Sequence, residues 1–186
     1  MAQEPTYPLL SLPDYQIVQK LREMSLEKIL EFSLISERCK DLVKSIQTRA
    51  TSFNVEICER IYFNIGTGPK NMTIDFYEEP NLYWGMGAHG RKKKLTVPQT
   101  VNVIECGEMI SDDKTSTWEN NTLTMQYWLK HLQDIFNYPK IGYIWFTTDS
   151  SQFDIDDIKE VFGTATQVWI SHTVHKTERS NFQLPS

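Results

Sequence analysis

The stretch YPLLSLPDYQIVQKL, residues 7–21, decides how the first part of this chain is built, with three leucines and two prolines in its first seven residues. After Pro13, the apolar residues Ile17, Leu21 and Met24 follow at i, i+4 and i+7, which places them on one stripe of a helix. Pro13 suits the first turn of that helix, because its missing N–H would have no partner there in any case. The stretch therefore predicts an apolar turn followed by an amphipathic helix.

Two more short helices are expected next, each after a serine that can accept a hydrogen bond from the first helical turn. The predicted N-caps and apolar positions are Ser25 with Leu26, Ile29 and Leu30, and Ser36 with Cys39, Leu42, Val43 and Ile46. A bundle of about forty residues rarely buries enough apolar surface to be stable by itself. No place in so small a core is evident for five of its apolar residues, Leu9, Leu10, Leu12, Leu34 and Ile35. We expect them either to bind another protein or to pack against the remainder of this chain.

The composition is that of a globular protein, with 186 residues of which 40% are hydrophobic and 23% charged. No apolar run approaches the roughly 20 residues that a membrane-spanning helix needs. Residues 3–6 show no basic or apolar segment of a secretion signal, and the three cysteines form no CxxC pair. We therefore expect a protein of the cytoplasm or the nucleus with reduced thiols and no membrane contact.

The negative charge lies in the second part of the chain. Residues 1–50 carry seven basic and seven acidic side chains, whereas residues 51–186 carry twelve and seventeen. Such a surface repels a phosphate backbone, so nucleic acid is not an expected partner. Within this acidic part lies one basic run, Arg91, Lys92, Lys93 and Lys94. It is a candidate site for an acidic or phosphorylated segment of a target protein. Its alternatives are a nuclear-import signal and a solvated loop tip.

From Phe53 onward the apolar period changes to two, which is typical of strands with one buried face. The strands that we expect are residues 53–57, 61–65, 73–77 and 95–104, with a turn at residues 66–69. They predict a small β-meander. Residues 85–90, GMGAHG, match the pattern GxGxxG, but a basic run follows them instead of a helix that could face a pyrophosphate. A hairpin loop is the better interpretation.

The last third of the chain alternates helices with strands. A helix over residues 125–136, with Thr124 as N-cap, precedes a strand at Ile141–Thr147 that we expect to be buried because of its Ile, Tyr and Trp content. A second helix starts at Asp154 and ends at Gly163, before a strand at Gln167–Thr173. Because a helix connects these two strands, they are expected to be parallel.

The N-terminal residues, read together, resemble the F-box. The matching positions are Pro8, Leu9, Leu10, Leu12, Pro13, Ile17, Leu21, Leu26, Ile29, Leu30, Ser33, Leu34, Ser36, Arg38, Lys40 and Val43. The resemblance implies docking to the Skp-type adaptor of a cullin-based ubiquitin ligase. It assigns that contact to Pro8, Leu9, Leu10, Leu12, Pro13, Ile17, Leu26, Ile29, Leu30 and Leu34. The chain departs from many F-boxes at Tyr15, where an acidic residue is usual, and at Cys39, where a tryptophan is usual.

The segments LTMQYWLKHLQDIFNYPKI and SSQFDIDDIKEVF resemble the type-two F-box-associated domain, which follows the F-box in a family greatly expanded in nematodes. The matching positions are Trp128, Leu129, His131, Leu132, Ile135, Phe136, Phe153, Asp154, Ile155 and Ile158. The resemblance implies a region that binds a target protein and has no catalytic residues. Members of that family normally continue beyond the strand that corresponds to Val168–Thr173, so we expect a shortened target-binding surface.

The expected fold class is α+β, with a three-helix F-box at residues 7–50 and a β-meander at residues 51–122. A helix–strand–helix–strand unit at residues 123–174 and a polar tail at residues 175–186 follow. The four histidines at positions 89, 131, 172 and 175 form no metal-binding or catalytic motif. We expect a substrate-recognition subunit of an SCF-type ubiquitin ligase that has no enzymatic activity, cofactor or metal. The alternative is an interaction module that acts outside any ligase.

Overall fold

The computed structural model describes residues 8–68, 70–77, 95, 97–98, 100–106, 114–120, 122–163 and 165–171. It begins with a 3-10 turn and three short helices, η1 (Pro8–Ser11), α1 (Asp14–Leu21), α2 (Leu26–Ser33) and α3 (Glu37–Ser45). The two predicted serine caps are confirmed: Ser25 Oγ accepts from the Lys28 amide at 3.3 Å, and Ser36 Oγ accepts from the Cys39 amide at 3.2 Å. Pro13 is the N-cap of α1, so it precedes the helix instead of lying in its first turn.

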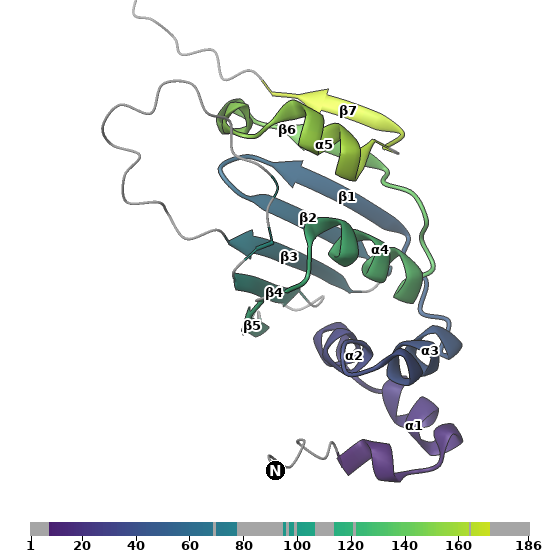
Figure 1. Ribbon diagram of the computed structural model, residues 1–186. Coiled ribbons are helices and arrows are strands. Elements are labelled where there is room, and N and C mark those ends of the chain that lie inside the picture. The colour runs from purple at the N-terminus through teal and green to yellow at the C-terminus, as the bar shows by residue number, and fades with distance from the viewer. Residues whose placement is uncertain are drawn as a thin grey trace, which may run out of the picture.

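A seven-stranded mixed sheet follows, in the order β5-β4-β3-β2-β1-β6-β7 (Figure 1). Its strands are β1 (Ser52–Ile57), β2 (Ile61–Gly66), β3 (Asn71–Tyr77), β4 (Thr100–Cys106), β5 (Lys114–Glu119), β6 (Tyr143–Phe146) and β7 (Gln167–Ile170). The first five form an antiparallel meander, whereas β6 pairs parallel with β1 and β7 pairs parallel with β6. The predicted parallel pair is confirmed. The regions that we delimited at residues 51–122 and 123–174 therefore share one sheet.

Two helices, α4 (Met125–Ile135) and α5 (Ile155–Phe162), cover one face of this sheet, and the 3-10 turn η2 (Thr148–Gln152) precedes α5 (Figure 1). Both predicted caps are present, since Thr124 Oγ1 accepts from the Tyr127 amide at 3.1 Å and Asp154 Oδ1 from the Asp156 amide at 2.9 Å. The predicted α+β class is confirmed.

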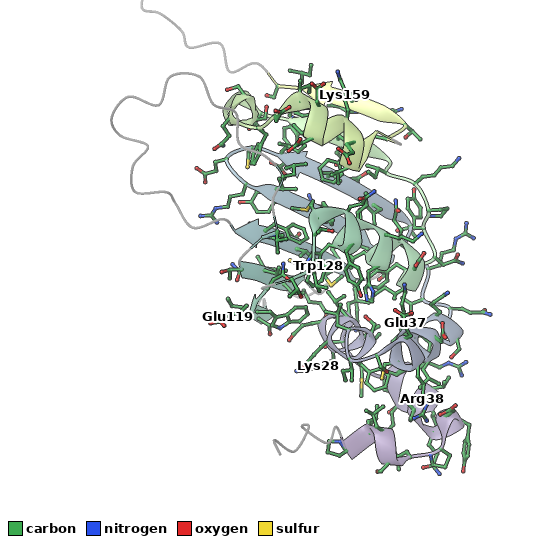
Figure 2. All side chains as sticks on the ribbon, viewed as in Figure 1. Lys28, Glu37, Arg38, Glu119, Trp128 and Lys159 are labelled. Carbon is green, nitrogen blue, oxygen red and sulfur yellow. The ribbon has the colours of Figure 1, made fainter. Side chains whose placement is uncertain are left out.

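Aromatic rings fill the space between the sheet and these helices. Phe63 of β2 meets Phe162 of α5 with ring centroids 5.8 Å apart, and Phe76 of β3 meets Trp128 of α4 at 5.9 Å. Trp128 lies in the interior of the molecule, whereas Lys159 lies at its periphery (Figure 2). These edge-to-face pairs stabilise the packing beyond the area that they bury. One continuous apolar core thus joins the sheet, the two covering helices and the N-terminal bundle.

The middle of the chain differs from the sequence-based prediction at two strands. The strand expected from residue 95 begins at Thr100, because Pro98 has no N–H for a ladder and its carbonyl instead accepts from Asn120 Nδ2 at 2.6 Å. Strand β5 was not expected, because its sequence KTSTWE has little apolar alternation. The predicted turn before β3 is confirmed: Gly68 has a φ of 90°, and the Thr67 amide donates to Lys70 O at 2.9 Å.

The prediction that residues 141–147 form a buried strand is wrong for one face of β6. Ile144 is 4% exposed, but Tyr143 and Trp145 are 37% and 41% exposed. The covering helices lie on one face of the sheet, and these two side chains point to the other face.

No described helix has the length and apolar character that crossing a membrane requires.

Several features of the sequence analysis lie outside the described residues. They are the glycine loop at residues 85–90, the basic run Arg91, Lys92, Lys93 and Lys94, the histidines at positions 89, 172 and 175, and the tail at residues 175–186.

Candidate protein-interaction surfaces

The first candidate surface consists of Pro8, Leu9, Leu10, Leu12 and Pro13, and we call it the N-terminal apolar surface. Its backbone forms a hydrogen-bonded turn, because Ser11 Oγ donates to Pro8 O at 2.7 Å and the Leu12 amide donates to Leu9 O at 3.1 Å. The two prolines are exposed, and the three leucines are partly buried. In Figure 1, η1 and α1 lie at the end of the molecule that is farthest from β7.

Four of the ten residues that the F-box resemblance assigns to the adaptor contact are inside the molecule. Ile17 and Leu30 are 0% exposed, and Leu26 and Ile29 are 3% exposed. Side chains with at most 3% of their surface exposed have almost no area for a second protein in this conformation, so the prediction of direct contact is corrected for these four. Their apolar stripes face the other helices and the sheet, and they belong to the common core. Leu34 is partly buried against the same core.

Two apolar side chains that the resemblance did not assign are more exposed than most of the predicted ones. Tyr15 of α1 is 70% exposed, and Ile35, which follows α2, is 42% exposed. The hydroxyl of Tyr15 accepts from Gln16 Nε2 at 2.9 Å. Asp14 in the same turn forms an ion pair of 2.5 Å with Arg38 of α3. Tyr15 therefore extends the surface that the bundle presents away from the sheet.

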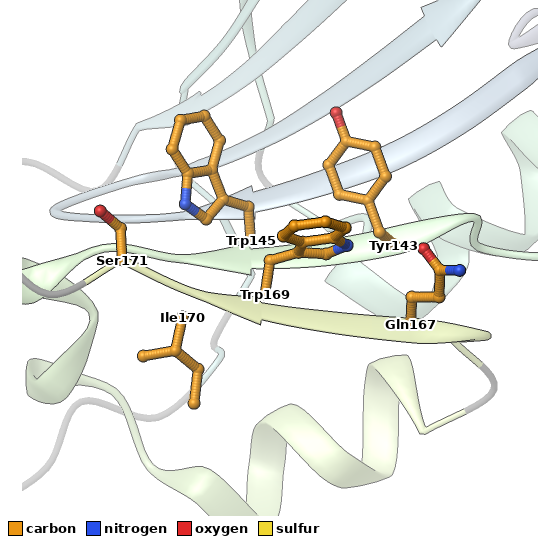
Figure 3. A pocket seen from close by; sticks show the side chains of 6 residues that line it. All are labelled: Tyr143, Trp145, Gln167, Trp169, Ile170 and Ser171. Atoms are coloured by element: carbon orange, nitrogen blue, oxygen red, sulfur yellow. The ribbon is translucent and has the colours of Figure 1, made fainter.

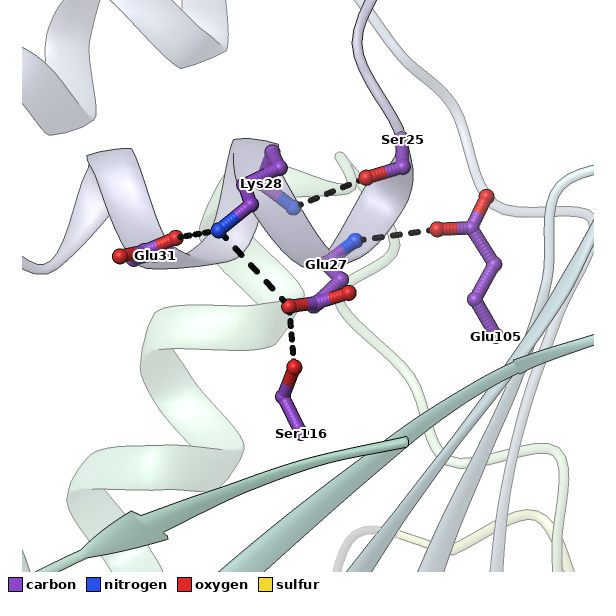
Figure 4. Close-up of polar contacts among 6 residues, drawn as sticks. All are labelled: Ser25, Glu27, Lys28, Glu31, Glu105 and Ser116. Atoms are coloured by element: carbon purple, nitrogen blue, oxygen red, sulfur yellow. Dashed lines mark hydrogen bonds and ion pairs between the residues drawn. The ribbon is translucent and has the colours of Figure 1, made fainter. Parts of the chain in front are cut away.

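Helix α2 is fixed to the β5 end of the sheet by buried polar contacts (Figure 4). Ser116 Oγ of β5 donates to Glu27 Oε1 at 2.5 Å, and the Glu27 amide donates to Glu105 Oε2 of β4 at 3.3 Å. Glu27 is 6% exposed and Glu105 is 8% exposed. Each has a cation near it: Lys28 Nζ is 4.0 Å from Glu27 Oε1, and Lys70 Nζ is 3.4 Å from Glu105 Oε1. The carboxylate of Glu105 also faces the positive end of the helix, which stabilises it.

His131 makes a second buried link between the bundle and α4. It is 2% exposed, and its Nε2 lies 2.7 Å from Ser33 Oγ. Ser33 donates its own proton to Leu30 O at 2.7 Å, so His131 Nε2 must be the donor in their contact. Burial, reinforced by the nearby charge of Lys40, lowers the pKa of His131 to about 4. His131 is thus neutral at pH 7, and Ser33 is not poised as a nucleophile because its proton is held by a carbonyl.

The second candidate surface lies on the uncovered face of β6 and β7 and was not predicted from the sequence. In the parallel register, Tyr143 lies beside Gln167 and Trp145 beside Trp169. Trp169 is 60% exposed. These side chains form a groove of about 670 Å³, which we call the aromatic groove (Figure 3). It is lined by Tyr143, Trp145, Gln167, Trp169, Ile170 and Ser171. The only sequence signal for it is the spacing of aromatic residues in YIWF and VWI.

A smaller groove of about 300 Å³ lies where α2 meets β5 and α4. Leu34 and Ile35 line it on one side, and Trp118 and Trp128 line it on the other. The two indole rings are stacked with centroids 6.4 Å apart. This groove is about half the volume of the aromatic groove and belongs to the junction between the bundle and the sheet.

Another buried carboxylate, that of Asp75, lies in the sheet. Asp75 of β3 is 4% exposed; burial raises its pKa, and the ion pair with Arg60 Nη1 at 3.2 Å opposes that rise. The thiols of Cys39 and Cys58 are not in a disulfide. Within the described ranges, no group of three or more His, Cys, Asp or Glu side chains is placed to hold a metal ion.

No model of a known protein family matches the chain, and neither a curated protein nor a solved structure matches it. Its function is therefore inferred from its own residues and their geometry.

Proposed function

We propose that the protein is the substrate-recognition subunit of a cullin-RING ubiquitin ligase of the SCF type. Its N-terminal apolar surface binds a Skp-type adaptor, and its sheet binds a target protein. The F-box resemblance of residues 8–43 supports this assignment, as does the order of three short helices that begin with serine or proline caps.

The observation that carries the proposal is the turn at residues 8–13. Its hydrogen bonds fix its shape, yet it leaves Pro8 and Pro13 exposed and Leu9, Leu10 and Leu12 partly accessible. Contiguous apolar surface on a small bundle is typical of a binding site. Tyr15, which is 70% exposed, enlarges the same surface. The buried side chains at positions 17, 26, 29 and 30 support this surface from inside.

The proposed role needs no catalytic residue, cofactor or metal, and it places the protein in the cytoplasm or the nucleus. A subunit of this kind holds its target near a ubiquitin-charged enzyme and so raises the effective concentration of the two reactants. The N-terminal apolar surface and β7 lie at opposite ends of the molecule, so an adaptor and a target could bind at the same time (Figure 1). The basic run Arg91, Lys92, Lys93 and Lys94 stays a prediction for binding a phosphorylated target.

Co-purification with a Skp-type adaptor tests the adaptor contact. We expect the wild-type chain to retain the adaptor and a variant with Leu9→Ser and Leu12→Ser to retain at least tenfold less, because it loses apolar contact area. The matched control carries the same change at the other end of the molecule, Val168→Ser with Ile170→Ser, and should retain the adaptor fully. Thermal unfolding of both variants shows whether they are folded.

If wild type fails to bind the adaptor under conditions in which an established F-box protein binds it, the ligase role is wrong. The alternative is then an interaction module in which the same apolar turn binds a different protein. Equal loss of adaptor in the two double variants would show that the N-terminal apolar surface is not the contact.

A further inference from the structure

The edge strand β7 is apolar and exposed on both faces of the sheet. Val168, Trp169 and Ile170 are 60%, 60% and 64% exposed. Trp169 points to the face of the aromatic groove, and Ile170 points to the opposite face (Figure 3). In the register with β6, Val168 lies beside the buried Ile144, which places Val168 on the face that the helices cover elsewhere. Neither face of this strand is therefore sealed by the described residues.

The outer edge of β7 also offers backbone groups that no described strand pairs with. No strand lies beyond it among the described residues, so the amides and carbonyls of alternate residues point away from β6. Natural sheets usually protect such an edge with lysine, proline or a bulge. The sequence of β7, QVWI, contains no charged residue and no proline. Pairing with β6 continues to the end of the strand, because the Ser171 amide donates to Phe146 O at 2.8 Å.

The length of this edge favours an extended peptide over a second copy of the chain. Four residues of strand span about 13 Å at roughly 3.3 Å per residue. A stable interface between two globular proteins buries about 800 Å² on each partner, which a contact along so short an edge does not supply. An added strand gains its affinity from main-chain hydrogen bonds and its specificity from alternate side chains, so it does not need this area.

The side chains around the edge define the chemistry of such a peptide. On the helix side, Val168 and Ile170 favour aliphatic residues at alternate positions. On the other side, the register places Glu56, Trp145 and Trp169 in one row across β1, β6 and β7. An arginine or lysine opposite Trp169 could lie over the indole ring, with its charge directed toward the carboxylate of Glu56.

We propose that β7 binds an extended segment of a partner protein as an eighth strand, with aliphatic side chains against Val168 and Ile170 and a basic side chain over Trp169. As the target site of a ligase, this surface rests on the proposed function. The addition of a strand is a separate property that can be measured in the absence of an adaptor.

A library of ten-residue peptides displayed on phage, selected against the full-length chain, tests the proposal. We expect enrichment of peptides in which aliphatic residues alternate and one arginine or lysine lies on the opposite face. The selected peptide is then made with N-methyl groups on alternate amides, in both registers. Methylation of the amides that face β7 should weaken binding at least tenfold, whereas methylation of the other set should leave binding nearly unchanged.

Variants of the protein locate the site. Val168→Lys with Ile170→Lys should weaken binding of the selected peptide at least tenfold, and Trp169→Ala should remove the preference for a basic residue. Tyr127→Ala, which changes an exposed aromatic residue on α4, is the control and should bind normally. Hydrogen exchange should show slower exchange of the amides in residues 167–171 when the peptide is bound.

Three results would overturn the proposal. They are a selection that enriches no alternating peptide, binding that is insensitive to backbone methylation, and a wild-type chain that sediments as a dimer and becomes a monomer on Val168→Lys. The last result would assign the edge to a second copy. Adaptor binding is measured separately, so a failure here leaves the ligase role standing, and a failure of adaptor binding leaves the strand site standing.

Discussion

The two edges of the sheet have opposite characters. Strand β5 has a charged residue at each end, Lys114 and Glu119, and it is tied to α2 through the hydrogen bond between Ser116 and Glu27. Strand β7 has no charged residue, and three of its four side chains are at least 60% exposed. One edge is used to dock another part of the same chain, whereas the other edge has no such cover in the described structure. The difference separates surfaces that stabilise this fold from surfaces that are available to a partner.

The comparison also explains why some apolar residues of the N-terminal bundle are not available to an adaptor. Helix α2 rests on β4 and β5, and this contact draws Leu26 and Ile29 into the common core. The accessible apolar residues that lie farthest from the sheet are those of the turn at residues 8–13 with Tyr15. The two candidate surfaces therefore lie at opposite ends of the molecule, and the junction between bundle and sheet holds them apart.

The largest expected difference between the two ends is in how much a tryptophan contributes to the free energy of unfolding. Trp128 is 2% exposed and packs against Phe76 and Trp118, so Trp128→Ala should lower the free energy of unfolding by about 3–5 kcal/mol. Trp169→Ala changes a side chain that is 60% exposed and should alter that free energy by less than about 0.5 kcal/mol. Urea denaturation of the two variants measures both values. Similar losses would mean that the β7 end is also part of the stability core.

A pH-dependent loss of stability should arise at the junction and not at β7. His131 is neutral in the folded protein, with a pKa of about 4, whereas an unfolded histidine has a pKa near 6.5. Below pH 6.5 the unfolded chain therefore binds a proton at His131 that the folded chain does not bind until the pH approaches 4. The contribution of His131 is complete above pH 6.5 and is lost between pH 6.5 and 4, by about 3 kcal/mol in total. Strand β7 has no group that titrates in this range.

Urea denaturation at a series of pH values measures this contribution. His131→Gln keeps an N–H donor toward Ser33 but does not titrate, so its stability should fall less steeply between pH 6.5 and 4 than that of wild type. Trp169→Ala is the control, and its pH profile should run parallel to the wild-type profile. If His131→Gln also ran parallel to wild type, the buried histidine would not be the source of the acid sensitivity.

Local signals were enough to predict the helices. The side chains of Ser25, Ser36, Thr124 and Asp154 each accept a hydrogen bond within the next few residues, so the sequence alone locates these helix starts. Period-two alternation is also a signal between residues close in the sequence, and it located β1 and β2. Strand β5 was missed because its place depends on pairing with β4 and docking of α2, which are contacts between residues far apart in the sequence.

The candidate surfaces depend on what covers each face, and this is not a local property. In YIWF the residues on both faces of β6 are apolar, so the pattern does not indicate which face is buried. In the structure Ile144 is buried, whereas Tyr143 and Trp145 are exposed. The leucines and isoleucines of the bundle present the same problem. Apolar spacing places them on one stripe of a helix, but only the docking of α2 decides that Ile29 faces the interior and that the turn at residues 8–13 does not.

The smallest effect in this comparison is the coupling between Glu27 and Ser116. Ser116→Ala removes a donor from a buried carboxylate and should lower the free energy of unfolding by about 1–2 kcal/mol. Glu27→Ala should lower the free energy of unfolding by a similar amount or slightly more, because Lys28 also loses the attraction of a nearby carboxylate. Gln167→Ala, a polar change at the β7 end, should stay within about 0.5 kcal/mol.

A double-mutant cycle isolates the contact itself. If Ser116 and Glu27 stabilise the docking of α2 through one hydrogen bond, the double variant should be less destabilised than the sum of the two single variants by about 1 kcal/mol. Strict additivity would mean that the two side chains act independently, and that the β5 end is held by its other contacts, which are apolar packing and the hydrogen bond from the Glu27 amide to Glu105. In that case the contrast between the edges would lie in what covers each strand and not in how each strand is bonded.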